Sequence, residues 1–76
     1  MNEEKYVTSD LYLTAYLKTK GFKFNLKEEY KKTKFEFDKT ESLMNNVYEY
    51  LSESGTCEPL SYTNAIKNLK NLLYNK

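Results

Sequence analysis

The sequence predicts a small α+β domain in which a short sheet is packed on one face by three helices, in the order β-α-β-β-α-α. Two observations lead to this expectation. Residues 22–38 contain two runs in which apolar and polar side chains alternate, as in a half-buried hairpin. Residues 10–20, 40–55 and 59–76 carry apolar side chains at helical spacing, and these apolar faces need a common partner to cover.

The chain has 76 residues, so we expect residues 1–76 to form a single domain, with residues 1–5 frayed. A lone Cys57 and the lack of His exclude an intramolecular disulfide and the usual kind of zinc site. Eight Tyr and four Phe supply the apolar area instead, and formation of a homodimer would extend it.

The first expected element is a short strand at residues 6–8, followed by a helix that starts after the capping residue Ser9 or Asp10. This helix is apolar over most of its surface, with a narrow polar strip that includes Thr14. Such a helix is expected to be largely covered by protein. Gly21 suits the left-handed conformation that ends a helix.

The alternating runs that follow predict a hairpin whose aromatic side chains point to one side. That side carries Phe22, Phe24, Leu26, Phe35 and Phe37. The connecting segment EEYKK lacks Asn-Gly or Asp-Gly, which predicts a loop of about four residues. The thirteen residues between the first strand and the hairpin suffice for a helical crossover, which would make the first two strands parallel.

Two further helices are expected, the first capped by Thr40 and ended by Gly55, the second with Pro59 at or just before its first turn. The apolar stripe of the first consists of Leu43, Met44, Val47, Tyr50 and Leu51. The stripe of the second consists of Tyr62, Ala65, Ile66, Leu69, Leu72 and Leu73.

Charge is unevenly distributed along the chain. Residues 18–39 contain eight Lys and four acidic residues, whereas residues 40–60 contain four Glu and no Lys. Mutual attraction between these two segments is the simplest explanation. The net charge of +1 and the absence of Arg argue against a dedicated nucleic-acid-binding protein, because Arg supplies bidentate contacts to guanine and phosphate.

The Lys-rich hairpin is nevertheless a candidate contact site for nucleic acid or a partner protein, through Lys27, Tyr30, Lys31, Lys32 and Lys34. Tyr30 at the tip has an aromatic ring that can stack on a base. The outward side of the hairpin also carries acids, so that Lys23 is expected to face Glu36 or Asp38 across the strands. Because each carboxylate cancels a phosphate-binding lysine, we favour a solvated, self-neutralised face over a nucleic-acid grip.

Tyr48 and Tyr74 lie outside the apolar stripes of their helices and are candidate interface aromatics. The alternative is that each covers an edge of the core.

The sequence contains no His, no Gly-rich phosphate loop and no Gly-x-Ser-x-Gly elbow, so we expect no catalytic residue. Cys57 lies away from the Lys cluster and is interpreted as an ordinary thiol. Glu49 and Glu53 share a helix face that is expected to be solvated, and we expect neither a metal site nor a cofactor.

Several short motifs follow one another along nearly the whole chain: Thr8–Leu11, Ala15–Leu17, Gly21–Phe22, Phe35–Phe37, Glu58–Pro59, Asn64–Ile66 and Leu69–Lys70. Their order resembles a family of small domains of unknown function from low-GC Gram-positive bacteria and their phages. The resemblance implies a stand-alone domain, often in mobile elements, and it implies no reaction.

The expected function is therefore non-enzymatic binding of a protein partner, as an adaptor or inhibitor of bacterial or phage origin. The alternative is a weak, mostly non-specific nucleic-acid-binding accessory protein that uses the Lys-rich hairpin. No apolar run reaches the ~18 residues that span a bilayer, and the acidic N-terminus is unlike a signal peptide. We thus expect a cytoplasmic protein without a membrane partner.

Overall fold

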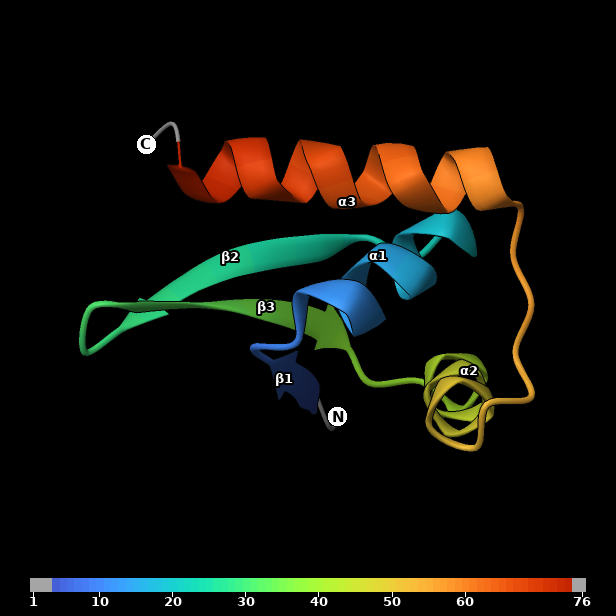
Figure 1. The fold of residues 1–76 in the computed structure, drawn as a ribbon. Coiled ribbons are helices and arrows are strands. Elements are labelled where there is room, and N and C mark those ends of the chain that lie inside the picture. Colours follow the sequence, from blue (N-terminus) through green and yellow to red (C-terminus); the bar gives the residue numbers. More distant parts are fainter. Residues whose placement is uncertain (1–3, 75–76) are drawn as a thin grey trace.

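The computed structural model describes residues 4–74, and these form three strands and three helices in the expected order (Figure 1). The elements are β1 (Lys5–Thr8), α1 (Leu11–Thr19), β2 (Phe24–Glu29), β3 (Lys32–Asp38), α2 (Glu41–Leu51) and α3 (Pro59–Tyr74). Of the segment expected to be frayed, residues 1–3 lie outside the described residues. The expectation that residues 1–5 are frayed is wrong for Lys5, which belongs to β1 and whose ammonium pairs with the Asp38 carboxylate.

The sheet is three-stranded and antiparallel, in the order β1-β3-β2. Both β1 and β2 pair with β3, so they run in the same direction but are not neighbours. α1 therefore crosses from one edge of the sheet to the other, as in a split β-α-β unit. This arrangement places the hairpin's second strand at the centre of the sheet, where it is paired on both sides.

One face of the sheet is apolar. Tyr6 and Phe24 lie opposite Phe37, and Phe35 and Phe37 are buried against the helices. Phe22, which was expected in the hairpin strand, precedes β2, but it still packs against the core. Its N–H donates to the carbonyl of Leu17 as part of the cap that ends α1, so it is not available for strand pairing.

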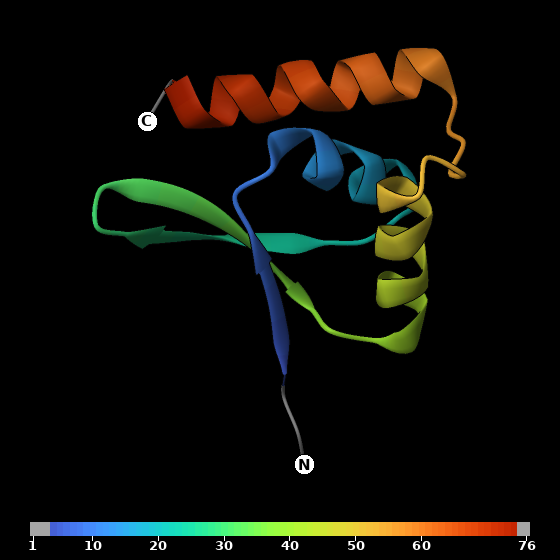
Figure 2. The same cartoon turned by 60° about the horizontal axis from the view of Figure 1, so that its bottom comes forward.

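The end of α1 confirms the expected role of Gly21, whose φ of 93° is left-handed. Asp10 is the N-cap residue, and its carboxylate accepts hydrogen bonds from the N–H groups of Tyr12 and Leu13. Thr14 was expected on a polar strip but is buried, because the sheet, α2 and α3 enclose α1 (Figure 2). The Thr14 hydroxyl donates to the Asp10 carbonyl at 3.0 Å, so it keeps a hydrogen-bond partner although it is buried.

α2 begins after Thr40 as expected but ends earlier, at Leu51. The left-handed residue beyond it is Glu53, with a φ of 61°, so Gly55 does not end the helix. Leu43 and Val47 are buried, whereas Leu51 in the last turn is exposed, contrary to the expected stripe.

α3 begins at Pro59, and Glu58 caps it by accepting hydrogen bonds from the N–H groups of Leu60 and Ser61. These two hydrogen bonds lower the pKa of the Glu58 carboxyl from its ordinary value. Ala65 and Leu69 are buried against α1, and Leu72 near the C-terminal end is largely exposed.

Candidate functional site

The turn between β2 and β3 contains only Tyr30 and Lys31, so the expected four-residue loop is wrong. Both residues have left-handed backbones, with φ of 51° and 68°. This is the pattern of a type I′ turn, whose twist matches the twist of the flanking strands and which usually contains Asn-Gly. The pairing of the two strands, rather than the turn residues, therefore selects this turn.

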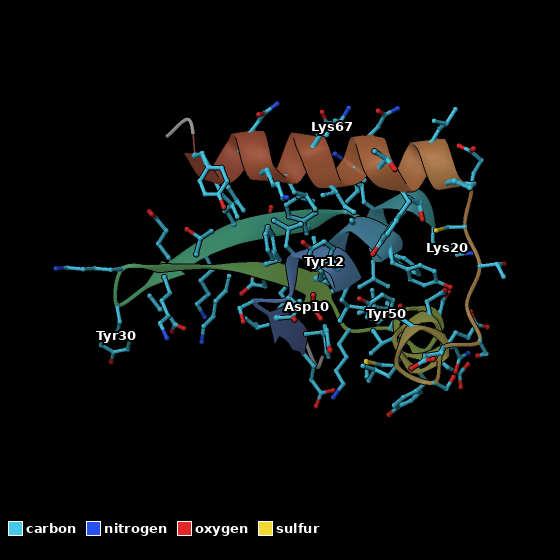
Figure 3. The ribbon with its side chains drawn as sticks, viewed as in Figure 1. Asp10, Tyr12, Lys20, Tyr30, Tyr50 and Lys67 are labelled. Carbon is cyan, nitrogen blue, oxygen red and sulfur yellow. The ribbon has the colours of Figure 1, made fainter. Side chains whose placement is uncertain are left out.

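A left-handed backbone at a residue with a side chain costs roughly 1–2 kcal/mol. Here six residue pairs between β2 and β3 hold the turn in place. The Tyr30 side chain is 96% exposed and points away from the body at the end of the hairpin (Figure 3). It makes no compensating contact with the core.

The lysines nearer the body of the hairpin have acidic neighbours. Lys27 and Lys34 lie directly opposite each other, which alone would be repulsive. Glu29 lies 3.5 Å from the Lys34 ammonium and 3.9 Å from that of Lys27, and Glu36 lies 4.0 Å from Lys27. These four side chains together carry no net charge.

Lys23 precedes β2, but it lines a shallow pocket together with Glu36 and Asp38, the acids that it was expected to face. Asn25 lies directly opposite Glu36, and the Asp38 carboxylate pairs with Lys5. Within residues 4–74, the ion pairs leave out Lys31 and Lys32. We call Tyr30, Lys31 and Lys32 the hairpin tip. It is an exposed aromatic side chain followed in the chain by two lysines that form no ion pair among the described residues.

A second group of tyrosines, away from the hairpin tip, comes from β1, the start of α1, α2 and the start of α3. Tyr12 is 49% exposed, Tyr48 is 62% exposed and Leu51 is 63% exposed. Tyr6, Tyr50 and Tyr62 are partly buried, and the Tyr62 hydroxyl donates to the Tyr12 carbonyl at 3.3 Å. We call these six residues the tyrosine patch.

Three phenols of the tyrosine patch, those of Tyr6, Tyr50 and Tyr62, lie within reach of the Asp10 charge. Burial, followed by the negative charge of Asp10, raises the pKa of both Tyr6 and Tyr50. Burial and the neighbouring Tyr50 raise the pKa of Tyr62 to about 12. All three phenols are therefore protonated near neutral pH, and Figure 3 shows Tyr12, Tyr50 and Asp10 gathered where α1 meets α2.

Of the two expected interface aromatics, Tyr48 belongs to the tyrosine patch. Tyr74 is exposed at the C-terminal end of α3, on the side of the molecule where the hairpin projects (Figure 1). The structure therefore does not bring them together. Tyr6, Tyr12 and Tyr62 were missed as site residues, because each comes from a different element and its local pattern indicates only a partly buried position.

The two oppositely charged segments do not neutralise each other. The hairpin tip and α2 lie at opposite ends of the molecule (Figure 2). Among residues 4–74, no ion pair joins a hairpin lysine to Glu41, Glu49, Glu53 or Glu58. The expected attraction between the segments is therefore not carried by ion pairs of the hairpin lysines, although Lys20 of the basic segment donates a hydrogen bond to the Thr56 carbonyl of the acidic one.

Other features offer little chemistry. An open groove of about 340 Å³ between α1 and α3 is lined by Lys18, Thr19, Ser61, Asn64, Ala65 and Asn68. Cys57 is half-buried in the connection before α3. In the described part of the chain, acidic and Cys side chains form no group of three suited to a metal ion, and no helix is long and apolar enough to cross a membrane.

The chain belongs to a family of domains of unknown function, since the model of that family, DUF5659, matches residues 3–75. Comparisons with curated proteins and with solved structures gave no match.

Proposed function

For this member of the DUF5659 family, we propose a non-enzymatic, protein-binding function, as an adaptor or inhibitor that presents the hairpin tip to its partner. The observation that carries the proposal is Tyr30, which is 96% exposed on a turn that its own side chain disfavours. Backbone strain of this kind is retained where the residue has a use other than folding.

The composition of the hairpin tip fits a protein contact. Asn-Gly would form the same turn without the cost of a left-handed backbone at Tyr30 and Lys31. Tyr is enriched among the residues that dominate binding energy, because it buries a large area and loses little rotamer freedom. With Lys31 in the turn and Lys32 directly after it at the start of β3, the complementary surface is a pocket of aromatic size with an acidic rim.

The alternative is weak, mostly non-specific nucleic-acid binding through the same hairpin. Tyr30 has a ring that stacks on a base, and Lys31 and Lys32 lack ion pairs among residues 4–74. However, the carboxylates beside Lys27 and Lys34 cancel two of the charges that would bind phosphate. This neutralisation favours the protein partner.

A bacterial or phage origin, with a cytoplasmic setting, is part of the proposal. It is supported by the resemblance described above and by a composition rich in Lys, Asn and Tyr, which is typical of AT-rich genomes.

The test is affinity capture with the tagged full chain from a nuclease-treated extract of the cells that encode it, with the double variant Tyr30→Asn/Lys31→Gly alongside. We expect the parent to capture a protein that the double variant loses. We also expect the variant to be more stable by about 1 kcal/mol, because the strain of the turn is relieved. Loss of binding together with increased stability cannot be attributed to unfolding.

The matched control is Tyr74→Asn, which removes another exposed tyrosine and should leave capture unchanged. Capture of the same protein by the double variant at parental affinity would contradict the assignment to the hairpin tip. Capture from a parallel, untreated extract that is absent from the nuclease-treated one, with direct binding to labelled DNA or RNA, would support the alternative instead.

A further inference from the structure

We propose that the tyrosine patch is a second docking surface, and that it takes a basic segment of a partner protein whose Lys or Arg side chains stack on Tyr12 and Tyr48. This inference goes beyond the function proposed for the hairpin tip and rests on different residues.

The first argument is the exposed aromatic and apolar area. Tyr48 and Leu51 are three residues apart on α2, so they are neighbours on one side of that helix. Tyr12 lies at the start of α1, which packs against α2, and its N–H donates to the Asp10 carboxylate, whose charge reaches Tyr6 and Tyr50. Exposed Tyr and Leu side chains gathered from two helices resemble the core of a protein interface, where Lys is depleted.

The second argument is charge. Residues 40–66 contain four Glu and no Lys, and within residues 4–74 those carboxylates form no ion pair. Asp10 adds a further negative charge beside Tyr6 and Tyr50 of the tyrosine patch. A cation held over a tyrosine ring gains from the ring quadrupole, and here the surrounding carboxylates add Coulomb attraction. An acidic or nucleic-acid partner would be repelled by the same charges.

The molecule already contains one contact of the proposed kind. The Lys20 ammonium lies 5.2 Å from the centre of the Tyr16 ring and donates a hydrogen bond to the Thr56 carbonyl. Lys20 therefore shows how a lysine binds between a ring and a hydrogen-bond acceptor at this end of the fold. Tyr12 and Tyr48, by contrast, have no cation over their rings among the described residues.

The probe is a short labelled peptide of Arg, Gly and Ser, compared with its counterpart in which neutral citrulline replaces each Arg. Binding is followed by fluorescence anisotropy, and the site is mapped by amide chemical-shift changes on the full chain. We expect saturable binding of the Arg peptide that weakens with salt, shift changes centred on residues 48–51 and Tyr12, and no binding of the citrulline peptide.

Two substitutions at Tyr48 distinguish the contribution of its aromatic ring to peptide binding from the contribution of its hydroxyl. Tyr48→Phe keeps the ring and should bind like the parent, whereas Tyr48→Leu should bind about two- to fivefold more weakly, the usual worth of an exposed cation–π contact. Glu41→Gln/Glu49→Gln should also weaken binding. Tyr74→Leu, which alters an exposed tyrosine outside both the hairpin tip and the tyrosine patch, is the matched control and should bind the Arg peptide like the parent.

Equal binding of the citrulline peptide, or shift changes that map elsewhere, would overturn the proposal. The basic hairpin tip of a second copy is the competing occupant. A salt-sensitive dimer of the chain alone in sedimentation velocity, abolished by Lys31→Glu/Lys32→Glu, would assign the tyrosine patch to self-association and overturn the proposal as well.

Discussion

Gly55 packs directly against the buried ring of Tyr16. A Cβ at Gly55 would lie 2.7 Å from Cζ of Tyr16 and closer still to its hydroxyl, in a space already occupied. Gly55 thus serves a close approach between the α2–α3 connection and α1, and it does not terminate α2. The same connection is held by the hydrogen bond from Lys20 to the Thr56 carbonyl.

Gly55→Ala is expected to destabilise the protein by about 1–3 kcal/mol, because the added methyl group overpacks a site that the Tyr16 ring already fills. Urea unfolding of parent and variant measures the loss. A Gly55→Ala variant as stable as the parent would show that the connection can move away from Tyr16 at no cost.

Tyr16→Phe is the companion variant. The Tyr16 hydroxyl is buried and has no hydrogen-bond partner among the described residues, so its removal should leave stability unchanged or slightly higher. Combined with Gly55→Ala, it should restore part of the lost stability, since it removes the atom nearest to the new methyl group. Additive effects in this double-mutant cycle would contradict the contact.

The second prediction compares two leucines of α3 that the sequence pattern treats alike. Leu69 is fully buried, and Leu69→Ala should cost about 2–5 kcal/mol, enough to unfold a marginal domain at moderate temperature. Leu72 is 45% exposed, and Leu72→Ala should cost clearly less, because much of its side chain is already in water. Thermal melts that give equal losses would refute the packing of α3.

The third prediction concerns alkaline pH. Burial raises the pKa of Tyr62 from 10.0 to about 12, so the folded state holds its phenol proton more tightly than the unfolded state. The resulting stability is fully present below pH 10 and is lost as the pH rises to about 12. Tyr62→Phe should therefore lose less stability over this interval than the parent.

An ultraviolet phenolate titration of the two proteins provides the check. The parent should show a late-titrating phenol that Tyr62→Phe lacks. If the spectral difference between them instead titrates at the ordinary value for tyrosine, the Tyr62 environment described here is wrong.

Local sequence signals determined much of the secondary structure. Asp10 and Thr40 cap helices because their side-chain oxygens reach the free N–H groups of the next turn. Gly21 adopts the left-handed conformation that ends α1. Strict alternation placed Phe35 and Phe37 on one face, since successive strand residues point to opposite sides. Each of these signals acts over a few neighbouring residues and can be read directly.

Only the tertiary structure decided the strand pairing, the burial of several helix residues and the grouping of the tyrosines. Pairing of β1 with β3 joins residues about thirty apart, and nothing in either strand alone selects that partner over β2. Thr14 is buried and Leu51 is exposed because their surroundings come from other elements, which local periodicity does not specify. The tyrosine patch could not be predicted for the same reason: its members come from four elements, and only folding brings Tyr6, Tyr50 and Tyr62 within reach of the Asp10 charge.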